Sequence, residues 1–375
     1  MTAAAHLAPF RTAARLVVKV GSALLVAEDG SARRDWLSTL AADVAACHAR
    51  GQRVVLVSSG AIALGARVLG LKSGGRASLE DAQAAAAVGQ IRLAGLWAEL
   101  LAAHGLTAAQ MLVTLGDFED RRRWLNASAT LDRLVTLGVV PVLNENDSVA
   151  TEEIRFGDND RLAARVAQAA RADAVILLSD VDGLYTANPD RVPDARRIDL
   201  VPDLDAVAGL ADSGSRSGMG SGGMAAKLEA ARIARAGGIS LAIAAGAPPH
   251  PLARFLATGE GTVVPAAAGA PARKAWLVGR MVVTGRLRVD AGAAGALRQG
   301  RSLLAAGIAA VEGAFARGDA VDVVAPDGRV IARGLVAYDA AEVARIAGKR
   351  SDAIAGILGY APRSAVIHRD QMVML

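Results

Sequence analysis

Leu16-Val17-Val18-Lys19-Val20 is the first of six short, β-branched runs that decide the fold of this chain. The other strand candidates are residues 53–57, 110–113, 139–143, 174–178 and 240–244. Longer segments of helical period lie between and beside them, over residues 36–50, 82–104, 121–137, 159–170 and 224–236. This alternation predicts an α/β fold with a mainly parallel sheet between helix layers. Ligands of such sheets collect at the carboxyl ends of strands, where several of the motifs below begin.

The length of 375 residues predicts two domains. We expect the first domain to span residues 1–260 and a Pro/Ala/Gly-rich linker to span 261–275. Residues 276–375 switch to short alternating segments with glycines between them, which predicts a small β-rich domain. Nothing in this second domain has obvious chemistry.

Composition narrows the class of protein. No apolar run is long enough to cross a bilayer and the N-terminus lacks a secretory pattern, so we expect a cytoplasmic protein with no membrane contact. The net charge of +5 and pI near 9.8 raise a nucleic-acid interpretation, but the longest basic run is Arg121-Arg122-Arg123. Only five of the 42 basic residues are lysines, and two of them, Lys19 and Lys227, lie in glycine-rich elements. A compact ammonium is favoured there over a guanidinium.

A glycine-rich segment runs from Gly218 to Lys227. Its Gly-x-Gly-x-x-Gly spacing would indicate a dinucleotide site only after a strand, and here it follows a polar loop. The segment instead predicts a loop and a helix start whose free backbone N–H groups, with Lys227, hold phosphate. A plain connecting loop is the alternative.

Lys19 is costly inside an apolar run unless its ammonium meets an anion. Gly21 and Ser22 follow it and can bring backbone amides close to a phosphate. The alternative is an edge lysine that reaches solvent. Residues 58–60 repeat the order of strand, small polar residues and glycine, and could contact a substrate or γ-phosphate.

Carboxylates and carboxamides cluster in Asn144-Glu145-Asn146-Asp147 and in Gly157-Asp158-Asn159-Asp160. Helix capping by Asp158 or Asn159 explains one of them. The others indicate a socket for a small cationic group, or, with substrate phosphates, a Mg²⁺ site. Residues 179–186 offer donors and acceptors for an adenine or ribose, although Asp182-Gly183 also fits a tight turn.

Together these segments resemble the amino acid kinase family, and within it the members that act on free L-glutamate. The resemblance covers nearly the whole chain, and the C-terminal part is similar to a PUA module. Ala226 departs from the pattern, which often has a hydroxyl residue there. The segments that carry the resemblance are the Lys19 strand, 58–61, Ala87-Val88-Gly89-Gln90, 144–147, 157–160, 183–186 and 222–227.

The resemblance implies ATP-dependent phosphorylation of the L-glutamate side-chain carboxylate to L-glutamyl 5-phosphate, the first step of proline biosynthesis. It implies catalytic roles for Lys19, Lys227 and Asp160, with Asp160 orienting the two lysines. The implied glutamate ligands are Ser59, Asn144, Asp147, Asp158 and Asn159, with Asp147 and Asp158 nearest the α-ammonium. The implied ATP ligands are Lys19, Gly21, Ser179, Asp180, Ser221, Gly222, Gly223, Met224, Ala225, Ala226 and Lys227. No residue is assigned to a metal.

The resemblance also implies Mg²⁺ with the ATP, feedback inhibition by proline, transfer of product to a glutamyl phosphate reductase, and a homo-oligomer. An acidic pocket suits a substrate with a free ammonium better than N-acetylglutamate or a nucleoside monophosphate. RNA binding is the competing hypothesis, because PUA modules occur in RNA-binding proteins. An aromatic content of 3% supplies few stacking platforms, so we do not expect it.

Overall fold

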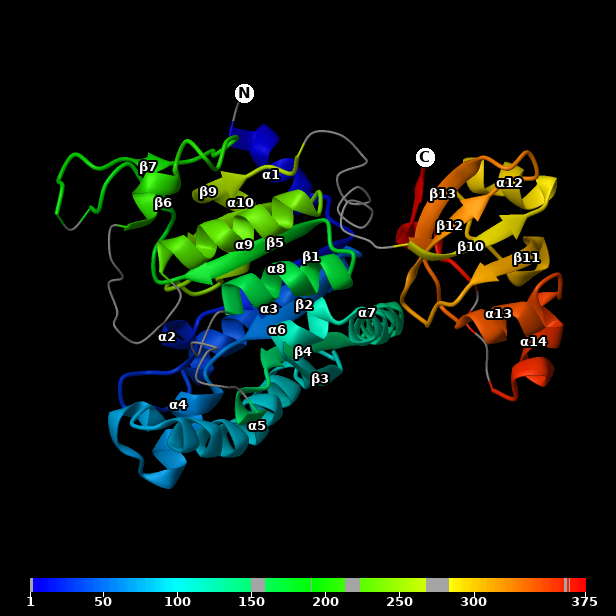
Figure 1. The fold of residues 1–375 in the computed structure, drawn as a ribbon. Coiled ribbons are helices and arrows are strands. Elements are labelled where there is room, and N and C mark those ends of the chain that lie inside the picture. Colours follow the sequence, from blue (N-terminus) through cyan, green and yellow to red (C-terminus); the bar gives the residue numbers. More distant parts are fainter. Residues whose placement is uncertain are drawn as a thin grey trace. The chain divides into compact units, whose positions relative to one another are not determined.

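The computed structural model describes residues 3–149, 159–189, 191–212, 223–267, 283–360, 363 and 365–375. The chain forms two compact units, Met1–Ala267 and Ala268–Leu375 (Figure 1). No helix in the described part of the chain is both long and apolar enough to span a membrane.

The first unit is built on a seven-stranded sheet of order β3-β4-β2-β1-β5-β8-β9. Every pairing in it is parallel except β8 with β9, so the predicted mainly parallel sheet is confirmed. All six strand candidates form strands. The bounds are β1 Arg15–Val20, β2 Arg53–Ser58, β3 Ala108–Val113, β4 Val140–Glu145, β5 Ala174–Ser179, β8 Ser240–Ala245 and β9 Gly261–Val264.

Two helix layers cover the sheet (Figure 1). Along β1, Leu16 and Val18 pack with α3 and α5, whereas Val17 packs with α8 and α9. Because side chains alternate along a strand, Lys19 projects on the α8–α9 side. The helices are α1 Ala3–Arg11, α2 Ser22–Leu25, α3 Arg34–Ala49, α4 Ala61–Leu69, α5 Leu79–Ala102, α6 Leu115–Glu119, α7 Arg121–Thr136, α8 Asn159–Ala169, α9 Met224–Ala236 and α10 Pro251–Thr258, with 3₁₀ turns η1 Lys72–Gly75, η2 Asp147–Val149 and η3 Ala208–Asp212.

The structure differs from the sequence prediction at the start of the linker. Residues 261–264, expected to begin a linker, form edge strand β9, which pairs antiparallel with β8. The buried Thr262 explains why this segment stays on the sheet, since its hydroxyl accepts a hydrogen bond from the Leu184 N–H and donates one to the Ile198 carbonyl. These bonds tie β9 to a small hairpin, β6 Leu184–Tyr185 and β7 Arg197–Ile198. The β9 strand therefore belongs to the first unit.

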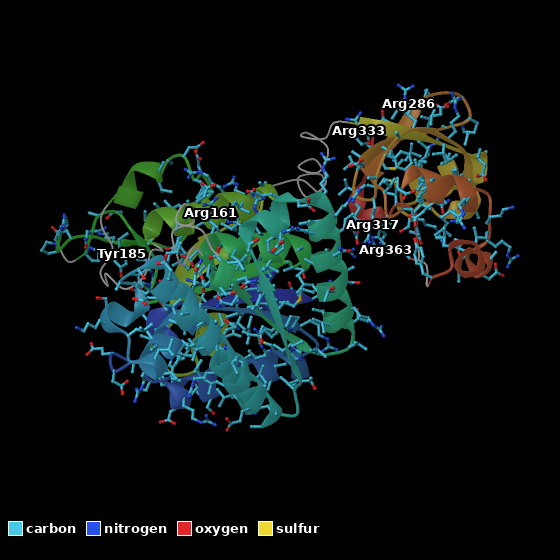
Figure 2. The ribbon with its side chains drawn as sticks, turned by 60° about the horizontal axis from the view of Figure 1, so that its bottom comes forward. Arg161, Tyr185, Arg286, Arg317, Arg333 and Arg363 are labelled. Atoms are coloured by element: carbon cyan, nitrogen blue, oxygen red, sulfur yellow. The ribbon has the colours of Figure 1, made fainter. Side chains whose placement is uncertain are left out.

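The second unit is β-rich, as predicted. Its sheet has the order β11-β10-β12-β13-β14 and encloses its own apolar core. Figure 2 shows Arg286 and Arg333 on strands of this sheet, and Arg333 is paired with Asp322 at 2.8 Å. The elements are β10 Val283–Val289, β11 Ile308–Gly313, β12 Ala320–Val324, β13 Val330–Leu335, β14 Met372–Met374, α12 Ala291–Arg298, α13 Ala340–Ile346, α14 Ser351–Leu358, η4 Ala305–Gly307 and η5 Arg369–Gln371.

Candidate active site

Lys19, Asp160 and Lys227 meet in a buried ionic cluster on the α8–α9 side of the sheet. Lys19 comes from β1, and Asp160 and Lys227 come from the first turns of α8 and α9. The Lys19 Nζ lies 2.6 Å from one carboxylate oxygen of Asp160, and the Lys227 Nζ lies 3.0 Å from the other. The three residues are only 7%, 1% and 5% exposed. The alternative for Lys19, an edge lysine reaching solvent, is therefore wrong.

In the ionic cluster, the one carboxylate of Asp160 faces the two ammonium groups of Lys19 and Lys227. Burial raises the pKa of Asp160, but the charges and hydrogen bonds of Lys19 and Lys227 outweigh burial and hold that pKa below its ordinary value. The carboxylate thus stays ionised and fixes both lysines. Two ammonium groups held close together by one carboxylate can contact an anion such as a polyphosphate.

A chain of neutral amides lies beside the ionic cluster. The Asn144 side-chain amide donates to the Gln90 Oε1 at 2.9 Å. The Asn159 amide donates to the Asn144 Oδ1 at 3.0 Å and to the Ser59 hydroxyl at 2.6 Å. We call Gln90, Asn144, Asn159 and Ser59 the carboxamide chain. The Asn159 Oδ1 accepts no hydrogen bond from a backbone N–H of the described residues, so this side chain does not cap α8.

One atom of the carboxamide chain has no hydrogen-bond partner within the described ranges. Asn159 is 3% exposed, and its Oδ1 accepts no hydrogen bond from any residue that the structure describes. A buried acceptor without a donor costs about 1–3 kcal/mol. The position is therefore suited to a ligand that brings an N–H group.

Asp147 lies beside the carboxamide chain, at the start of η2. A cavity of about 270 Å³ is lined by Gln90 and Asp147 together with Asn146 and Ser148. Burial raises the pKa of the Asp147 carboxyl to about 6, against the opposing charge of Arg76. A cationic ligand beside Asp147 would stabilise the ionised carboxylate and so lower this raised pKa.

Close helix packing places the turn that carries Ser59. Gly65 of α4 faces the backbone of α5, and a Cβ on Gly65 would lie 1.8 Å from the Ala85 carbonyl oxygen. A Cβ on Gly89 would lie 1.8 Å from the Ala61 carbonyl oxygen. Only glycine allows the two backbones to approach this closely. Gln90 follows Gly89, so the same contact also positions the first member of the carboxamide chain.

The ATP ligands implied by the resemblance lie at ends of β1 and β5 and at the start of α9. Gly21 follows β1 and begins α2, and Ser179 ends β5, where its hydroxyl donates to the Asp180 carboxylate at 2.9 Å. Gly223 precedes α9, and Met224, Ala225 and Ala226 form its first turn with Lys227. The remaining predicted site residues, Asp158, Ser221 and Gly222, lie outside the described residues.

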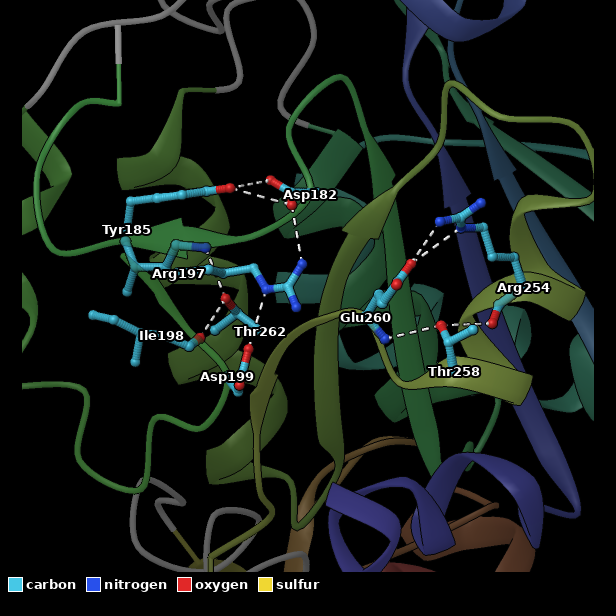
Figure 3. Close-up of polar contacts among 10 residues, drawn as sticks. Asp182, Tyr185, Arg197, Ile198, Asp199, Arg254, Thr258, Glu260 and Thr262 are labelled. Carbon is cyan, nitrogen blue, oxygen red and sulfur yellow. Dashed lines mark hydrogen bonds and ion pairs between the residues drawn. The ribbon is translucent and has the colours of Figure 1, made fainter. Parts of the chain in front are cut away.

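A polar network supports the segment that follows Asp180 (Figure 3). Asp182 accepts hydrogen bonds from the Tyr185 hydroxyl at 3.0 Å and from Arg197 at 3.0 Å. Arg197 also pairs with Asp199 at 3.1 Å. In the turn between α10 and β9, Glu260 pairs with Arg254 at 2.7 Å, and the backbone N–H of Glu260 donates to the Thr258 hydroxyl. The Asp182-Gly183 turn is thus held by the β6–β7 hairpin and β9.

The site contains residues that sequence reasoning missed. Gln90 stood within a quoted motif but received no role, although it bonds directly to Asn144. Trp97 donates to the Ser58 hydroxyl at 2.9 Å and so supports the residue before Ser59. The signal that could have indicated both is their spacing on α5, since residues seven apart share a helix face. Among the described residues, no group of three or more His, Cys, Asp and Glu side chains could hold a metal alone.

Comparison with known proteins places this geometry in context. Residues 14–245 match the amino acid kinase family, and residues 285–358 match the PUA domain. Glutamate 5-kinase of Sphingopyxis alaskensis is 64% identical over 96% of this chain and 97% of that protein. Glutamate 5-kinase of Novosphingobium aromaticivorans is 61% identical over 99% and 98%. Among solved structures, UMP kinase from Bacillus anthracis gives a TM-score of 0.46 at 16% identity, over 68% of this chain and 97% of that one.

Proposed function

The chain belongs to the amino acid kinase family, and from that premise we propose that it transfers the γ-phosphoryl group of ATP to the side-chain carboxylate of L-glutamate. The product is L-glutamyl 5-phosphate, and the reaction opens proline biosynthesis from glutamate. The observation that carries the proposal is the buried ionic cluster, in which Asp160 holds two ammonium groups next to the carboxamide chain, whose first member, Gln90, lines a cavity with Asp147.

In the proposed mechanism, Lys19 and Lys227 lie on either side of the phosphoryl group while it is transferred. The substrate carboxylate is already a nucleophile, so the reaction needs no general base. A carboxylate oxygen forms the new bond to phosphorus as the bond to the β,γ-bridging oxygen breaks, and ADP leaves with those electrons. Catalysis then depends on positioning and on neutralising charge, which the two ammonium groups supply. Asp160 keeps both ammonium groups in place.

We propose that L-glutamate binds along the carboxamide chain and reaches toward the cavity lined by Gln90 and Asp147. Ser59, Asn144 and Asn159 would bind it through neutral hydrogen bonds. Asp147 and Asp158 would face its α-ammonium, and the raised pKa of Asp147 supports such a partner for Asp147. This pocket distinguishes a free amino acid from its N-acetylated form, which has no ammonium to pair with a carboxylate.

ATP would bind across the strand ends of β1 and β5 and the start of α9. We assign its contacts to Lys19, Gly21, Ser179, Asp180 and the segment 221–227, whose helix N-terminus favours phosphate. Mg²⁺ would enter with the nucleotide, because phosphate oxygens supply the hard ligands that this ion prefers. It would neutralise phosphate charge, alongside the two lysines.

Further parts of the proposal concern the wider setting. We assign the reaction to the first unit, feedback inhibition to proline, and use of the labile product to a glutamyl phosphate reductase. We further propose a cytoplasmic homo-oligomer. RNA binding by the second unit is the alternative role, and a filter-binding assay with tRNA at about physiological salt tests it, because nonspecific attraction weakens steeply with salt.

The reaction is tested by incubating the protein with MgATP and hydroxylamine, which traps acyl phosphates as hydroxamates. L-Glutamate, N-acetyl-L-glutamate and L-aspartate serve as alternative acceptors, and ADP release is measured in parallel. We expect hydroxamate with L-glutamate alone. Hydroxamate from N-acetyl-L-glutamate at the same rate would contradict the role of the ammonium, and none from any acceptor would contradict the reaction.

A further inference from the structure

We propose that Gln90 is a positioning residue that makes the acceptor pocket selective for a free α-ammonium group. The inference rests on the function proposed above and deepens it. Gln90 would not touch the transferred phosphoryl group. It would act through Asn144 and Asn159, whose side-chain orientations it sets.

The carboxamide chain has a direction, which starts at the Oε1 of Gln90. A side-chain amide has one end that donates and one that accepts. Because Gln90 presents its Oε1, Asn144 must turn its NH₂ group toward Gln90 and its Oδ1 toward Asn159. Asn159 must then turn its own NH₂ group toward Asn144. Each orientation therefore follows from the one before it.

The direction of the chain decides what is left for a ligand. The Asn159 NH₂ group donates to both Asn144 and the Ser59 hydroxyl, so both of its hydrogens are used. What remains is the Asn159 Oδ1, buried and without a donor among the described residues. The Ser59 oxygen accepts from Asn159, which leaves its own hydroxyl hydrogen to donate. The pocket thus offers an acceptor for an ammonium and a donor for a carboxylate.

Without the Gln90 acceptor, the same residues can pair in the opposite sense. Asn144 could turn its NH₂ group toward the Asn159 Oδ1, and Asn159 would then present NH₂ hydrogens where an ammonium has to bind. A buried donor facing an ammonium leaves both groups unsatisfied, which costs about 1–3 kcal/mol. With its Oε1 facing Asn144, Gln90 therefore disfavours a pocket of reversed polarity.

Gln90 is well placed for this role and is not part of the apolar core. Its side chain is partly exposed and lines the same cavity as Asp147. Its backbone is held next to Gly89, where α5 touches α4. A substitution of the side chain should therefore leave folding intact, and the effect should fall on the ligand.

The test compares two acceptors, L-glutamate and glutarate, which has the same carbon chain with no ammonium group. Gln90→Leu removes the acceptor, and Gln90→Glu keeps a carboxylate oxygen in its place. In the hydroxamate assay, we expect Gln90→Leu to raise the KM for L-glutamate about tenfold and to leave that for glutarate within about twofold. Gln90→Glu should keep most of the wild-type preference, and kcat and the KM for ATP should change little. Gln83→Leu, on the same helix but outside the carboxamide chain, serves as the matched control.

The preference ratio separates positioning from a structural role. If Gln90→Leu weakens both acceptors equally, or leaves the ratio of their kcat/KM values at the wild-type value, the inference about Gln90 is wrong while the proposed reaction stands. If the wild-type protein makes no hydroxamate from L-glutamate, the proposed reaction is wrong and the inference fails with it. A drop in the ratio that Gln90→Glu restores supports the inference.

Discussion

The ionic cluster and the carboxamide chain occupy the same end of one sheet, but charged side chains form the first and neutral polar side chains form the second. Lys19, Asp160 and Lys227 form two charged contacts with almost no exposure. The carboxamide chain contains no charge and ends in an acceptor, the Asn159 Oδ1, that has no donor in the described part of the protein. Asn159 and Asp160 are neighbours in the first turn of α8, yet each belongs to a different set.

This difference indicates a division of labour within the site. Charge in a low-dielectric site stabilises the charge that develops in a transition state. Neutral hydrogen bonds fix which end of an amide faces a ligand, and so they discriminate among ground-state ligands. We therefore expect the ionic cluster to govern the rate and the carboxamide chain to govern selectivity.

The largest effect should come from Lys19→Ala. Removing one of the two ammonium groups takes away transition-state stabilisation, and we expect kcat to fall about 100-fold or more with little change in the KM for L-glutamate. Asp160→Ala should act in the same way, because it releases both lysines. Steady-state rates of ADP release measure this. Lys72→Ala, which removes an exposed lysine, is the control. An unchanged kcat in Lys19→Ala would contradict the claim that the ionic cluster governs the rate.

A large loss of stability should follow Gly89→Ala, which tests the helix contact that positions the carboxamide chain. The new methyl group would meet the Ala61 carbonyl oxygen, so α4 and α5 would have to separate. We expect the free energy of unfolding to fall by about 1–3 kcal/mol, measured by urea denaturation. Gly95→Ala on the same helix has open space and is the control. Equal stability in both variants would show that the helix contact does not position this region.

Asp147 should give the pocket a pH dependence that the ionic cluster lacks. The raised pKa of Asp147, about 6, means that its carboxyl is ionised at pH 7 and mostly protonated at pH 5. An ammonium binds the ionised form, so the KM for L-glutamate should rise about tenfold as the pH falls from 7 to 5. The lowered pKa of Asp160 keeps the ionic cluster charged over this range. A KM that is independent of pH, or equally dependent in Asp147→Asn, would contradict this role.

The smallest effect should come from Trp97→Phe. This change removes the donor to the buried Ser58 hydroxyl, which directly precedes Ser59. We expect a loss of about 1–2 kcal/mol in the free energy of unfolding and a change of only a few fold in the KM for L-glutamate. Trp36→Phe, on the α3 helix away from Ser59, is the comparison variant. A larger effect on kcat than on KM would contradict the division between rate and selectivity.

The ionic cluster and the frame of the sheet could be predicted from sequence, whereas the carboxamide chain could not be fully predicted. A lysine inside an apolar run needs an anionic partner, and the resemblance to the amino acid kinase family implied that Asp160 orients Lys19 and Lys227. Gln90 and Asn144 are 54 residues apart, and their bond depends on how α5 packs against the sheet. Which end of an amide faces a ligand is set only in three dimensions.

Short edge elements account for the remaining differences. The hairpin β6–β7 has two residues in each strand, and β9 has four, so neither shows a readable alternation. The Gly/Pro-rich sequence around β9 favoured a linker. The hydrogen bonds of the buried Thr262 hold β9 in place, and they reach Ile198, 64 positions away in the sequence, and Leu184, 78 positions away. Such long-range bonds leave no periodic signal in a sequence.

The division of labour is tested most directly by measuring kcat and the KM for L-glutamate of Lys227→Met and Asn159→Ala in one assay. Lys227 and Asn159 are equally buried, within a few per cent of full burial. We predict that Lys227→Met lowers kcat about 100-fold at a nearly constant KM, and that Asn159→Ala raises the KM about tenfold with a much smaller change in kcat. Loss of the same parameter in both variants would contradict the account.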